Sequence, residues 1–180
     1  MLPAYVRLPR PPLYVQGVLT LVPFELEYQD AVLCWRNSPE IARFMYRDEP
    51  IGVAEHQTWF SSAISDHEDR IHRMALIHSV PSGVMSLTHI DRVFGVAEWG
   101  GYLAPHVTRG AGHGRQLLES SMAFARDEIG LARLVVEVLE INQSALGLYR
   151  SVGFIEETRM SRAVVRDGQQ VDALRLTARL

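Results

Sequence analysis

The sequence contains no lysine, because all 18 of its basic residues are arginines. This absence excludes Schiff-base catalysis and the Walker A phosphate loop, and with it the P-loop nucleotide triphosphatases. A single cysteine, Cys34, excludes an internal disulfide and a zinc cluster built on cysteines. A chain so poor in cysteine favours a reducing, cytoplasmic location. We expect Cys34 to be a core residue of its helix and not a catalytic one.

Long apolar runs are also missing. No stretch approaches the roughly 18 residues that a membrane-spanning helix needs, and prolines stand at the N-terminus where a signal peptide would carry a cationic and then an apolar segment. The formal net charge of −3 argues against general affinity for nucleic acid. We therefore expect neither a membrane nor a nucleic acid as partner.

The seven histidines lack the paired spacings of metal ligands, so we expect no metal site. His67 lies within a polar cluster and His72 follows it, and both are expected to face solvent. The length of 180 residues, with 47% hydrophobic and 22% charged residues, is typical of one globular domain. Residues 1–13 hold four of the nine prolines and predict a proline-rich arm before a domain spanning 14–180.

Hydrophobic periodicity predicts an α/β fold in which helices cover the faces of a single sheet. A tight turn is expected at residues 81–83, and the adjacent Gly100 and Gly101 predict a β-bulge. Strands are expected at residues 15–24, 72–78, 84–90, 94–103, 131–139, from 153 onward and at 170–180. Helices are expected at residues 25–36, 40–46, 55–64, 114–126 and 142–151.

A glycine-rich turn, Arg109 to Gly114, lies between an expected strand and a long expected helix. Glycines allow close approach of the backbone to a phosphate, and the helix N-terminus adds unpaired N–H groups and a positive dipole. The dinucleotide fingerprint fails, because Leu117 stands where it requires a third glycine. The turn alone is compatible with phosphate binding or with an ordinary helix start.

A second motif, N-x-x-A-x-x-L-Y-x-x-x-G-F, begins at Asn142 and ends at Phe154. By itself it describes a helix that is capped by asparagine and closed by glycine. Together with R-x-x-G-x-G about 30 residues earlier, it resembles the two core motifs of the GNAT N-acetyltransferase superfamily. The resemblance covers roughly residues 14–178 and implies a mixed, mostly antiparallel sheet of about seven strands with about four helices.

The resemblance implies acetyl-coenzyme A as co-substrate and no metal. The strand that carries Gly100 and Gly101 would part from its neighbour and open a cleft for the thioester. Asn142 would contact the cofactor arm, and Tyr149 would protonate the departing thiolate or, alternatively, pack in the core. The residues implied to bind the cofactor through their backbone are Tyr102, Leu103 and Ala104 for the pantetheine arm and Arg109, Gly110, Ala111, Gly112, His113 and Gly114 for the pyrophosphate.

N-acetylation requires a neutral amine, so a base or a water chain must accept its proton. Glu98 and Glu137 lie on strands beside the expected cleft. A glutamate within an apolar run such as Val-Val-Glu-Val is costly to bury, which favours Glu137 as the base. Pairing with a nearby arginine is the alternative role for either carboxylate.

The N-terminal half, with Trp35-Arg36-Asn37 and Pro39, resembles the nucleotide-sugar N-acetyltransferases of pseudaminic-acid biosynthesis. That resemblance implies transfer to the 4-amino group of a UDP-linked 4-amino-4,6-dideoxy sugar. Arg36 and His56 would face the nucleotide or its phosphates, although either could instead be a helix-terminal residue with a structural role. Met45, Tyr46 and Trp59 would line the acceptor pocket.

Two alternatives remain open at this stage. The RimJ/RimL-like group, which acetylates ribosomal-protein N-termini, shares the W-R-N-x-P-E start, and Ile141 replaces an asparagine present in many relatives. A non-catalytic acyl-coenzyme A-binding module would keep the glycine loop while Glu137 and Tyr149 serve only the fold. A homodimer is compatible with either function.

Overall fold

The computed structural model describes residues 14–16 and 19–180, so the expected arm at 1–13 lies outside the described residues. The described strands form one eight-stranded sheet in the order β1-β2-β3-β4-β5-β6-β8-β7. Their bounds are β1 (Tyr14–Gln16), β2 (Leu19–Pro23), β3 (Arg70–Ile77), β4 (Val80–Asp91), β5 (Val96–Leu103), β6 (Arg133–Leu139), β7 (Ile155–Arg166) and β8 (Gln169–Arg179). The expected mixed, mostly antiparallel α/β class is confirmed, with β5 and β6 as the parallel pair.

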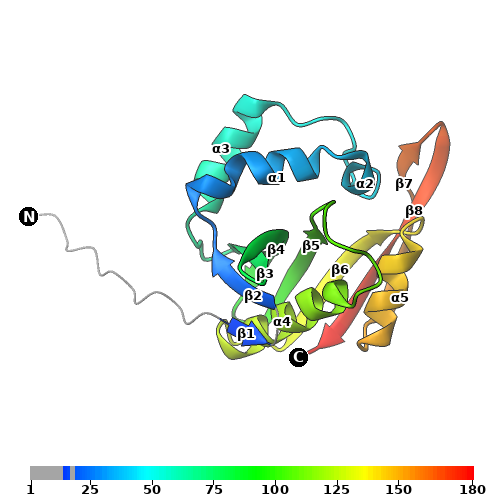
Figure 1. The fold of residues 1–180 in the computed structure, drawn as a ribbon. Helices are drawn as coiled ribbons and strands as arrows, with labels where there is room; N and C mark the ends of the chain where they lie inside the picture. The colour runs from blue at the N-terminus through cyan, green and yellow to red at the C-terminus, as the bar shows by residue number, and fades with distance from the viewer. Residues whose placement is uncertain (1–13, 17–18) are drawn as a thin grey trace, which may run out of the picture.

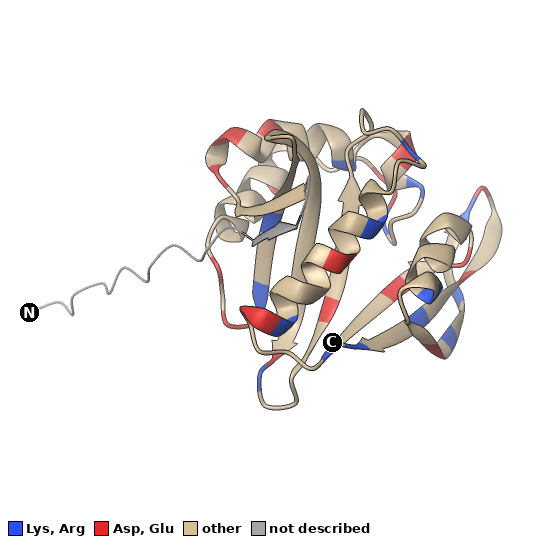
Figure 2. Ribbon diagram, turned by 60° about the horizontal axis from the view of Figure 1, so that its bottom comes forward, with Lys and Arg blue, Asp and Glu red and all other residues tan. Residues whose placement is uncertain are grey.

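Helices cover both faces of this sheet (Figure 1). Helices α1, α2 and α3 lie over one face, whereas α4 and α5 lie on the other. Charges of both signs are interspersed over the described elements (Figure 2). Every helix in the described part of the chain is too short or too polar to cross a membrane. The bounds are η1 (Leu26–Tyr28), α1 (Gln29–Arg36), α2 (Pro39–Ala42), α3 (Val53–Ala63), α4 (His113–Asp127) and α5 (Gln143–Ser151).

Helix α1 shows how burial selects one face of an amphipathic segment. Val32 and Trp35 are buried against the core, at the three-residue spacing that places both on one face. Cys34 lies between them in sequence and is therefore turned away from the core. The expectation that Cys34 is a core residue is wrong, because this side chain is exposed.

The parallel pairing of β5 with β6 is short. It joins Val96–Ala97–Glu98 to residues 133–135 and extends no further. Beyond Glu98, β5 continues along β4 and β6 continues along β8, so the two strands diverge. The expected opening of the sheet is therefore present, but the expected bulge at Gly100 and Gly101 is wrong, because both stay in continuous register with β4.

Gly101 is nevertheless required by its surroundings. A Cβ at this position would lie 2.8 Å from the Val84 carbonyl oxygen and 2.8 Å from the indole ring of Trp99, well inside van der Waals contact. At Gly100, by contrast, a Cβ would meet nothing within 4 Å. Gly101 is thus required by close packing, whereas Gly100 borders open space.

The turn between β3 and β4 is placed differently from the expectation at residues 81–83. His78 and Ser79 both have left-handed backbone angles, with φ of 50° and 65°, as a type I′ hairpin turn requires. Pro81 lies within β4, opposite Leu76 and next to a register shift in β3. Asparagine and glycine are the usual residues of such a turn, which is why the sequence did not reveal it.

His72 on β3 is buried, at 5% exposure, so the expectation that it faces solvent is wrong. Its Nδ1 lies 2.8 Å from the Ser86 hydroxyl, and its ring packs beside Phe24 and Trp59. Burial is the main reason why the pKa of His72 falls from 6.5 to about 4, with Arg70 adding to the effect. His67 is exposed, as expected.

This burial predicts that acid destabilises the fold. In the unfolded chain His72 takes up a proton near pH 6.5, whereas the folded protein resists protonation until about pH 4. The unfolded state therefore binds more protons in this window, and the free energy of unfolding should fall by about 3 kcal/mol as the pH drops through it. Urea unfolding of His72→Gln should show a shallower pH dependence over this range. His67→Gln, the exposed control, should keep the original slope, and an unchanged slope in His72→Gln would contradict the prediction.

Candidate active site

The divergence of β5 and β6 leaves one edge of β5 open. The Ala104 amide donates to the Ser82 carbonyl 2.8 Å away, which sets the alternation of the antiparallel ladder between β4 and β5. By that alternation, the polar main-chain groups of Tyr102 and Ala104 face β4, whereas those of Gly101 and Leu103 face the opening. Of the three residues expected to offer their backbone to a cofactor, only Leu103 is oriented to do so, and Gly101 was not anticipated.

The glycine-rich turn leads directly into α4. Gly110 and Gly112 have left-handed backbone angles, with φ of 79° and 84°, which favour glycine. Gly114 has no such requirement, because a Cβ there would make only ordinary contact with Leu148. The first hydrogen bond of α4 runs from the Gln116 amide to the Gly112 carbonyl. The amides before Gln116 therefore have no acceptor within the helix and can bind an anion.

The side chains around this turn have local partners. Arg109 Nη2 donates to the Leu103 carbonyl at 3.4 Å, and His113 Nδ1 lies 3.3 Å from Gln116 Oε1. Ala111 is exposed. Asn142 caps α5, as expected, because its Oδ1 accepts from the Ala145 amide at 3.2 Å. Its expected contact with a cofactor arm stays a prediction.

Tyr149 of α5 is buried beneath the opening. Its ring packs against Trp99 on β5 and against Phe154, with centroid distances of 6.0 and 5.5 Å. Its hydroxyl makes no hydrogen bond with any residue that the structure describes. Burial raises the pKa of Tyr149 above its ordinary value, so the hydroxyl stays protonated and can act as a donor.

Carboxylates lie on the opposite face of the sheet. Glu98 and Trp99 are consecutive on β5 and therefore point to opposite faces, which places Glu98 on the side of α1 and α3. Arg175 of β8 pairs with Glu137 in register and donates through Nη1 to Glu137 Oε1 at 2.7 Å and to Glu98 Oε1 at 3.2 Å. One guanidinium thus holds both of the acid-base candidates that the sequence indicates.

Both carboxylates have a second partner. The Tyr46 hydroxyl donates to Glu137 Oε2 at 3.0 Å, and His89 Nδ1 lies 3.0 Å from Glu98 Oε2. Burial and the adjacent Glu137 raise the pKa of Tyr46 to about 12, so Tyr46 remains a donor. Glu137 is exposed, and the expectation that it is buried in an apolar strand is wrong. Its neighbours Val136 and Val138 point to the buried face instead.

A cavity of about 340 Å³ lies between the N-terminal helices and the sheet. Four of the five residues expected to bind the acceptor line it, namely Arg36, Met45, His56 and Trp59. The fifth, Tyr46, is outside the lining and contacts Glu137 instead. The remaining lining residues are Val32, Ile51, Glu55, Val84, Ser86 and Tyr102.

Arg36 supplies the unbalanced charge of this mostly apolar cavity. Its Nη2 donates to the Arg47 carbonyl at 2.5 Å, whereas its buried Nη1 makes no hydrogen bond with the described residues. Burial lowers the pKa of Arg36, although arginine stays charged in proteins. The one carboxylate in the lining, Glu55, is paired with Arg47 through contacts of 2.6 and 3.3 Å. The cavity therefore favours an anionic group.

His56 has a more structural position than expected. It is buried, at 3% exposure, and its Nε2 donates to the Gln29 carbonyl at 2.8 Å. Its ring also packs against Trp59 and Phe60. Only its other ring nitrogen is left for a ligand.

Sequence reasoning missed Arg175 and Ser86. Arg175 lies in an alternating strand that shows no motif, and its proximity to Glu98 and Glu137 follows from strand order alone. Ser86 lines the cavity while contacting His72. Ser86 lies on β4 and His72 on the adjacent strand β3. Two polar residues in expected strands were visible in the sequence, but their contact could not be inferred without the register of the two strands.

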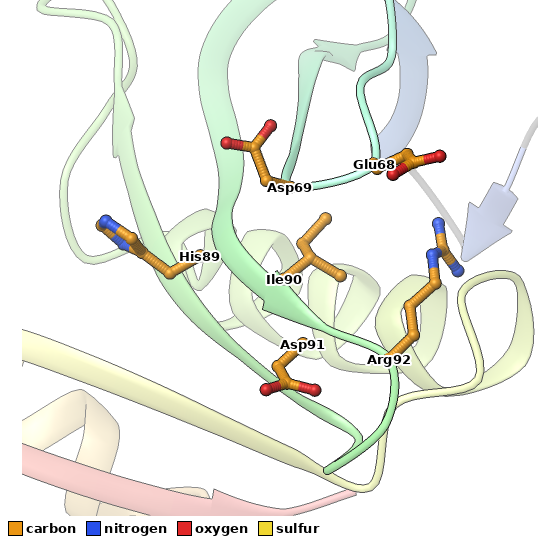
Figure 3. A pocket seen from close by; sticks show the side chains of 6 residues that line it. All are labelled: Glu68, Asp69, His89, Ile90, Asp91 and Arg92. Carbon is orange, nitrogen blue, oxygen red and sulfur yellow. The ribbon is translucent and has the colours of Figure 1, made fainter.

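A separate, open depression lies near the end of β4 (Figure 3). Its side chains point in different directions, with His89 and Arg92 on opposite sides (Figure 3). Among the described residues, no group of three or more His, Cys, Asp or Glu side chains could hold a metal ion. The lining consists of Glu68, Asp69, His89, Ile90, Asp91 and Arg92.

The fold has close counterparts among solved structures. The spermidine N-acetyltransferase from Vibrio cholerae, in complex with CoA and spermine, is 21% identical over 91% of this chain and 96% of that chain, with a TM-score of 0.83. RimL, a ribosomal-protein alpha-N-acetyltransferase in complex with coenzyme A, is 18% identical over 92% of this chain and 96% of that chain, with a TM-score of 0.79. No curated protein sequence shows significant similarity.

The family comparison covers most of the chain. The model of the acetyltransferase (GNAT) domain matches residues 18–155, which include the opening between β5 and β6, the glycine-rich turn and Tyr149. The matched segment contains both motifs that the sequence analysis identified. The chain therefore belongs to the GNAT acetyltransferase family.

Proposed function

We propose that this enzyme transfers acetyl from acetyl-CoA to a primary amine on an acceptor that carries phosphate, namely the 4-amino group of a UDP-linked amino-dideoxy sugar. The observation that supports this acceptor most directly is that Arg36 lines the cavity and that its buried Nη1 has no hydrogen-bond partner among the described residues, so a small turn of the guanidinium would present it to a ligand. A phosphate oxygen would accept a charge-assisted hydrogen bond from it. The sugar would then extend toward Glu137. Tyr46, which follows the cavity residue Met45, donates its hydrogen bond to this carboxylate.

The charge of the cavity also bears on polyamine acceptors. The similar solved structure from Vibrio cholerae is a spermidine N-acetyltransferase. In this chain, the Glu55 carboxylate of the cavity is neutralised by Arg47, and Arg36 remains as a cation. A polycation would meet repulsion from Arg36, whereas a diphosphate would be attracted.

The cofactor would bind across the opening of the sheet. The first-turn amides of α4, next to Gly110 and Gly112, fit a pyrophosphate, because they lack acceptors within the helix. The main-chain groups of Gly101 and the amide of Leu103 fit an extended amide-containing arm, because β6 has diverged there, whereas the Leu103 carbonyl accepts from Arg109. The thioester of acetyl-CoA, which carries the activated acetyl group, would then lie near Glu98 and Glu137.

The acid and the base would act from opposite faces of the sheet. Glu137 accepts a proton from the ammonium form of the acceptor, so that the neutral amine can attack the thioester carbonyl. Tyr149 then donates its hydroxyl proton to the thiolate as the C–S bond breaks, and the second proton that the nitrogen loses on becoming an amide passes through solvent and restores the tyrosine hydroxyl. Its position beneath β5 and its raised pKa support this role. Glu98, the second candidate base, shares Arg175 with Glu137.

The cofactor proposal is tested at Gly112. Valine there would be strained by the left-handed backbone and would place a side chain over the first-turn amides, so acetyl-CoA affinity should fall about tenfold or more. Calorimetry on Gly112→Val measures this loss. Gly130→Val, at a φ of 78° after the other end of α4, carries similar strain and should bind normally. Equal affinity in folded Gly112→Val and wild type would reject the assignment.

The acid-base proposal is tested by removing one group at a time. Acid-base groups typically contribute about 10²–10⁴-fold in rate, so Tyr149→Phe and Glu137→Gln should each lower kcat by this order with little change in acetyl-CoA affinity. Glu137→Gln should also abolish the acidic limb of the pH–rate profile, and Glu98→Gln should preserve it. Stopped assays of thiol release give these profiles. Loss of the limb in Glu98→Gln alone would make Glu98 the base.

The acceptor proposal is tested with a panel of UDP-amino-sugars and N-terminal peptides. Arg36→Ala should raise KM for the UDP-sugar about 10- to 100-fold, the value of a charged hydrogen bond, and should leave KM for acetyl-CoA unchanged. Arg133→Ala, an exposed arginine at the start of β6, serves as the control. Free UDP should inhibit competitively against the sugar. Turnover of a ribosomal N-terminal peptide without inhibition by UDP would favour the RimJ/RimL-like alternative.

A further inference from the structure

Residues 43–52, which connect α2 to α3, form a segment that we call the acceptor segment. Met45 and Ile51 of this segment line the cavity, and Tyr46 donates its hydroxyl proton to the hydrogen bond with Glu137 on β6. The segment therefore contributes to the cavity and also contacts the part of the sheet beyond the opening. Whether it keeps this position depends on its attachments on both sides.

Helices α1 and α3, which belong to the N-terminal half of the chain, contact the second half of the acceptor segment. Arg36 donates to the Arg47 carbonyl, and Arg47 pairs with Glu55 of α3. Asn37 makes two reciprocal hydrogen bonds with the main chain of Ile51, both at 2.9 Å. Met45 also packs against the core, but among the described residues no hydrogen bond or ion pair joins residues 44–46 to α1 or α3.

On the C-terminal side, Arg166 holds residues 44–48. It lies at the end of β7, where the β7–β8 hairpin reaches the neighbourhood of α2 (Figure 1). Its Nη2 donates to the carbonyls of Met45 and Tyr46, the latter at 3.1 Å, and its Nε lies 3.4 Å from Asp48 Oδ2. The Arg166 side chain is only 11% exposed, whereas that of Asp48 is 43% exposed. The guanidinium is therefore largely shielded from water, and its ion pair with Asp48 reaches the surface without a hydrogen bond from Nε.

The contacts of Arg166 lie next to the residue that contacts Glu137. Arg166 donates to the carbonyls on either side of the Tyr46 side chain, and the hydroxyl of that side chain contacts Glu137. Within the described residues, the β5–β6 pairing joins the two parts of the sheet over three residue pairs only. A second connection across the opening therefore matters for the distance between the cavity and Glu137.

We propose that Arg166 is a positioning residue for acetyl transfer, which fixes the acceptor segment so that Tyr46 orients Glu137 toward the cavity. Arg166 touches neither Glu137 nor the cavity and acts through the main chain of Met45 and Tyr46. The kinetic part of this inference rests on the proposed function, in which Glu137 is the base. The structural part, control of the acceptor segment, is independent of the acceptor.

The structural part is tested by hydrogen exchange of the full-length protein. In Arg166→Ala, the carbonyls of Met45 and Tyr46 and the Asp48 carboxylate lose their partner, so amides of residues 44–48 should exchange about tenfold faster through local opening. Arg166→Lys, which keeps the charge but lacks the fork, should exchange at an intermediate rate. Arg179→Ala, an exposed arginine at the far end of β8, is the control and should match wild type. Unchanged exchange in Arg166→Ala would overturn the proposal.

The kinetic part is tested with acetyl-CoA and the UDP-linked 4-amino-4,6-dideoxy sugar. Arg166→Ala should lower kcat about tenfold without changing the Kd of acetyl-CoA, and Tyr46→Phe should lower it similarly. If Arg166 acts through Tyr46, the double variant should be no slower than the slower single variant, because residues in one network are not additive. Additive losses would overturn the proposal. Faster exchange in Arg166→Ala with no turnover of this sugar by wild type would reject the proposed acceptor and uphold the control of the segment.

Discussion

The divergence of β5 from β6 after Glu98 is the constraint on which the rest of the site depends. Two adjacent parallel strands normally satisfy each other's main-chain groups, and here they stop doing so after three residue pairs. The opening exposes polar main-chain groups at Gly101 and Leu103 and gives access to both faces of the sheet. Tyr149 approaches from one face and the carboxylates from the other, so a bond placed in the opening lies between a proton donor and a proton acceptor.

Arg175 determines the electrostatics of the carboxylate face. Glu98 and Glu137 lie on neighbouring strands and would repel each other without the guanidinium between them. Sharing one cation leaves the group of three with a net negative charge, which attracts an ammonium. The cavity end has the opposite character, because Arg36 is its unbalanced group. The site therefore has a positive end in the cavity and a negative end at the carboxylates, which fits the proposed acceptor with a phosphate at one end and an amine at the other.

The features that could be predicted from sequence are those determined by local chemistry. The glycine turn at 109–114 and the Asn142 cap were recognisable, because backbone conformation and capping depend on neighbouring residues. The roles of Cys34 and His72 could not be read in this way, because the buried face of a helix or strand depends on what packs against it. Arg175 is 77 residues from Glu98 in sequence, and only the order of strands in the sheet brings them together. Glu137 was expected to be buried because β6 is apolar, yet its side chain is exposed while its neighbours Val136 and Val138 are buried.

The contact between α4 and α5 has a consequence for how the protein responds to its co-substrate. Arg115 in the first turn of α4 donates to the Ser151 hydroxyl at the end of α5 at 2.7 Å, and Leu148 lies against Gly114. The turn suited to a pyrophosphate and the helix that carries Tyr149 are therefore packed as one body. In the proposed function, an anion that orders the start of α4 would also order α5, so binding of the co-substrate and the rigidity of Tyr149 would be thermodynamically coupled. The proposed proton donor would then be most rigid when a thioester is bound.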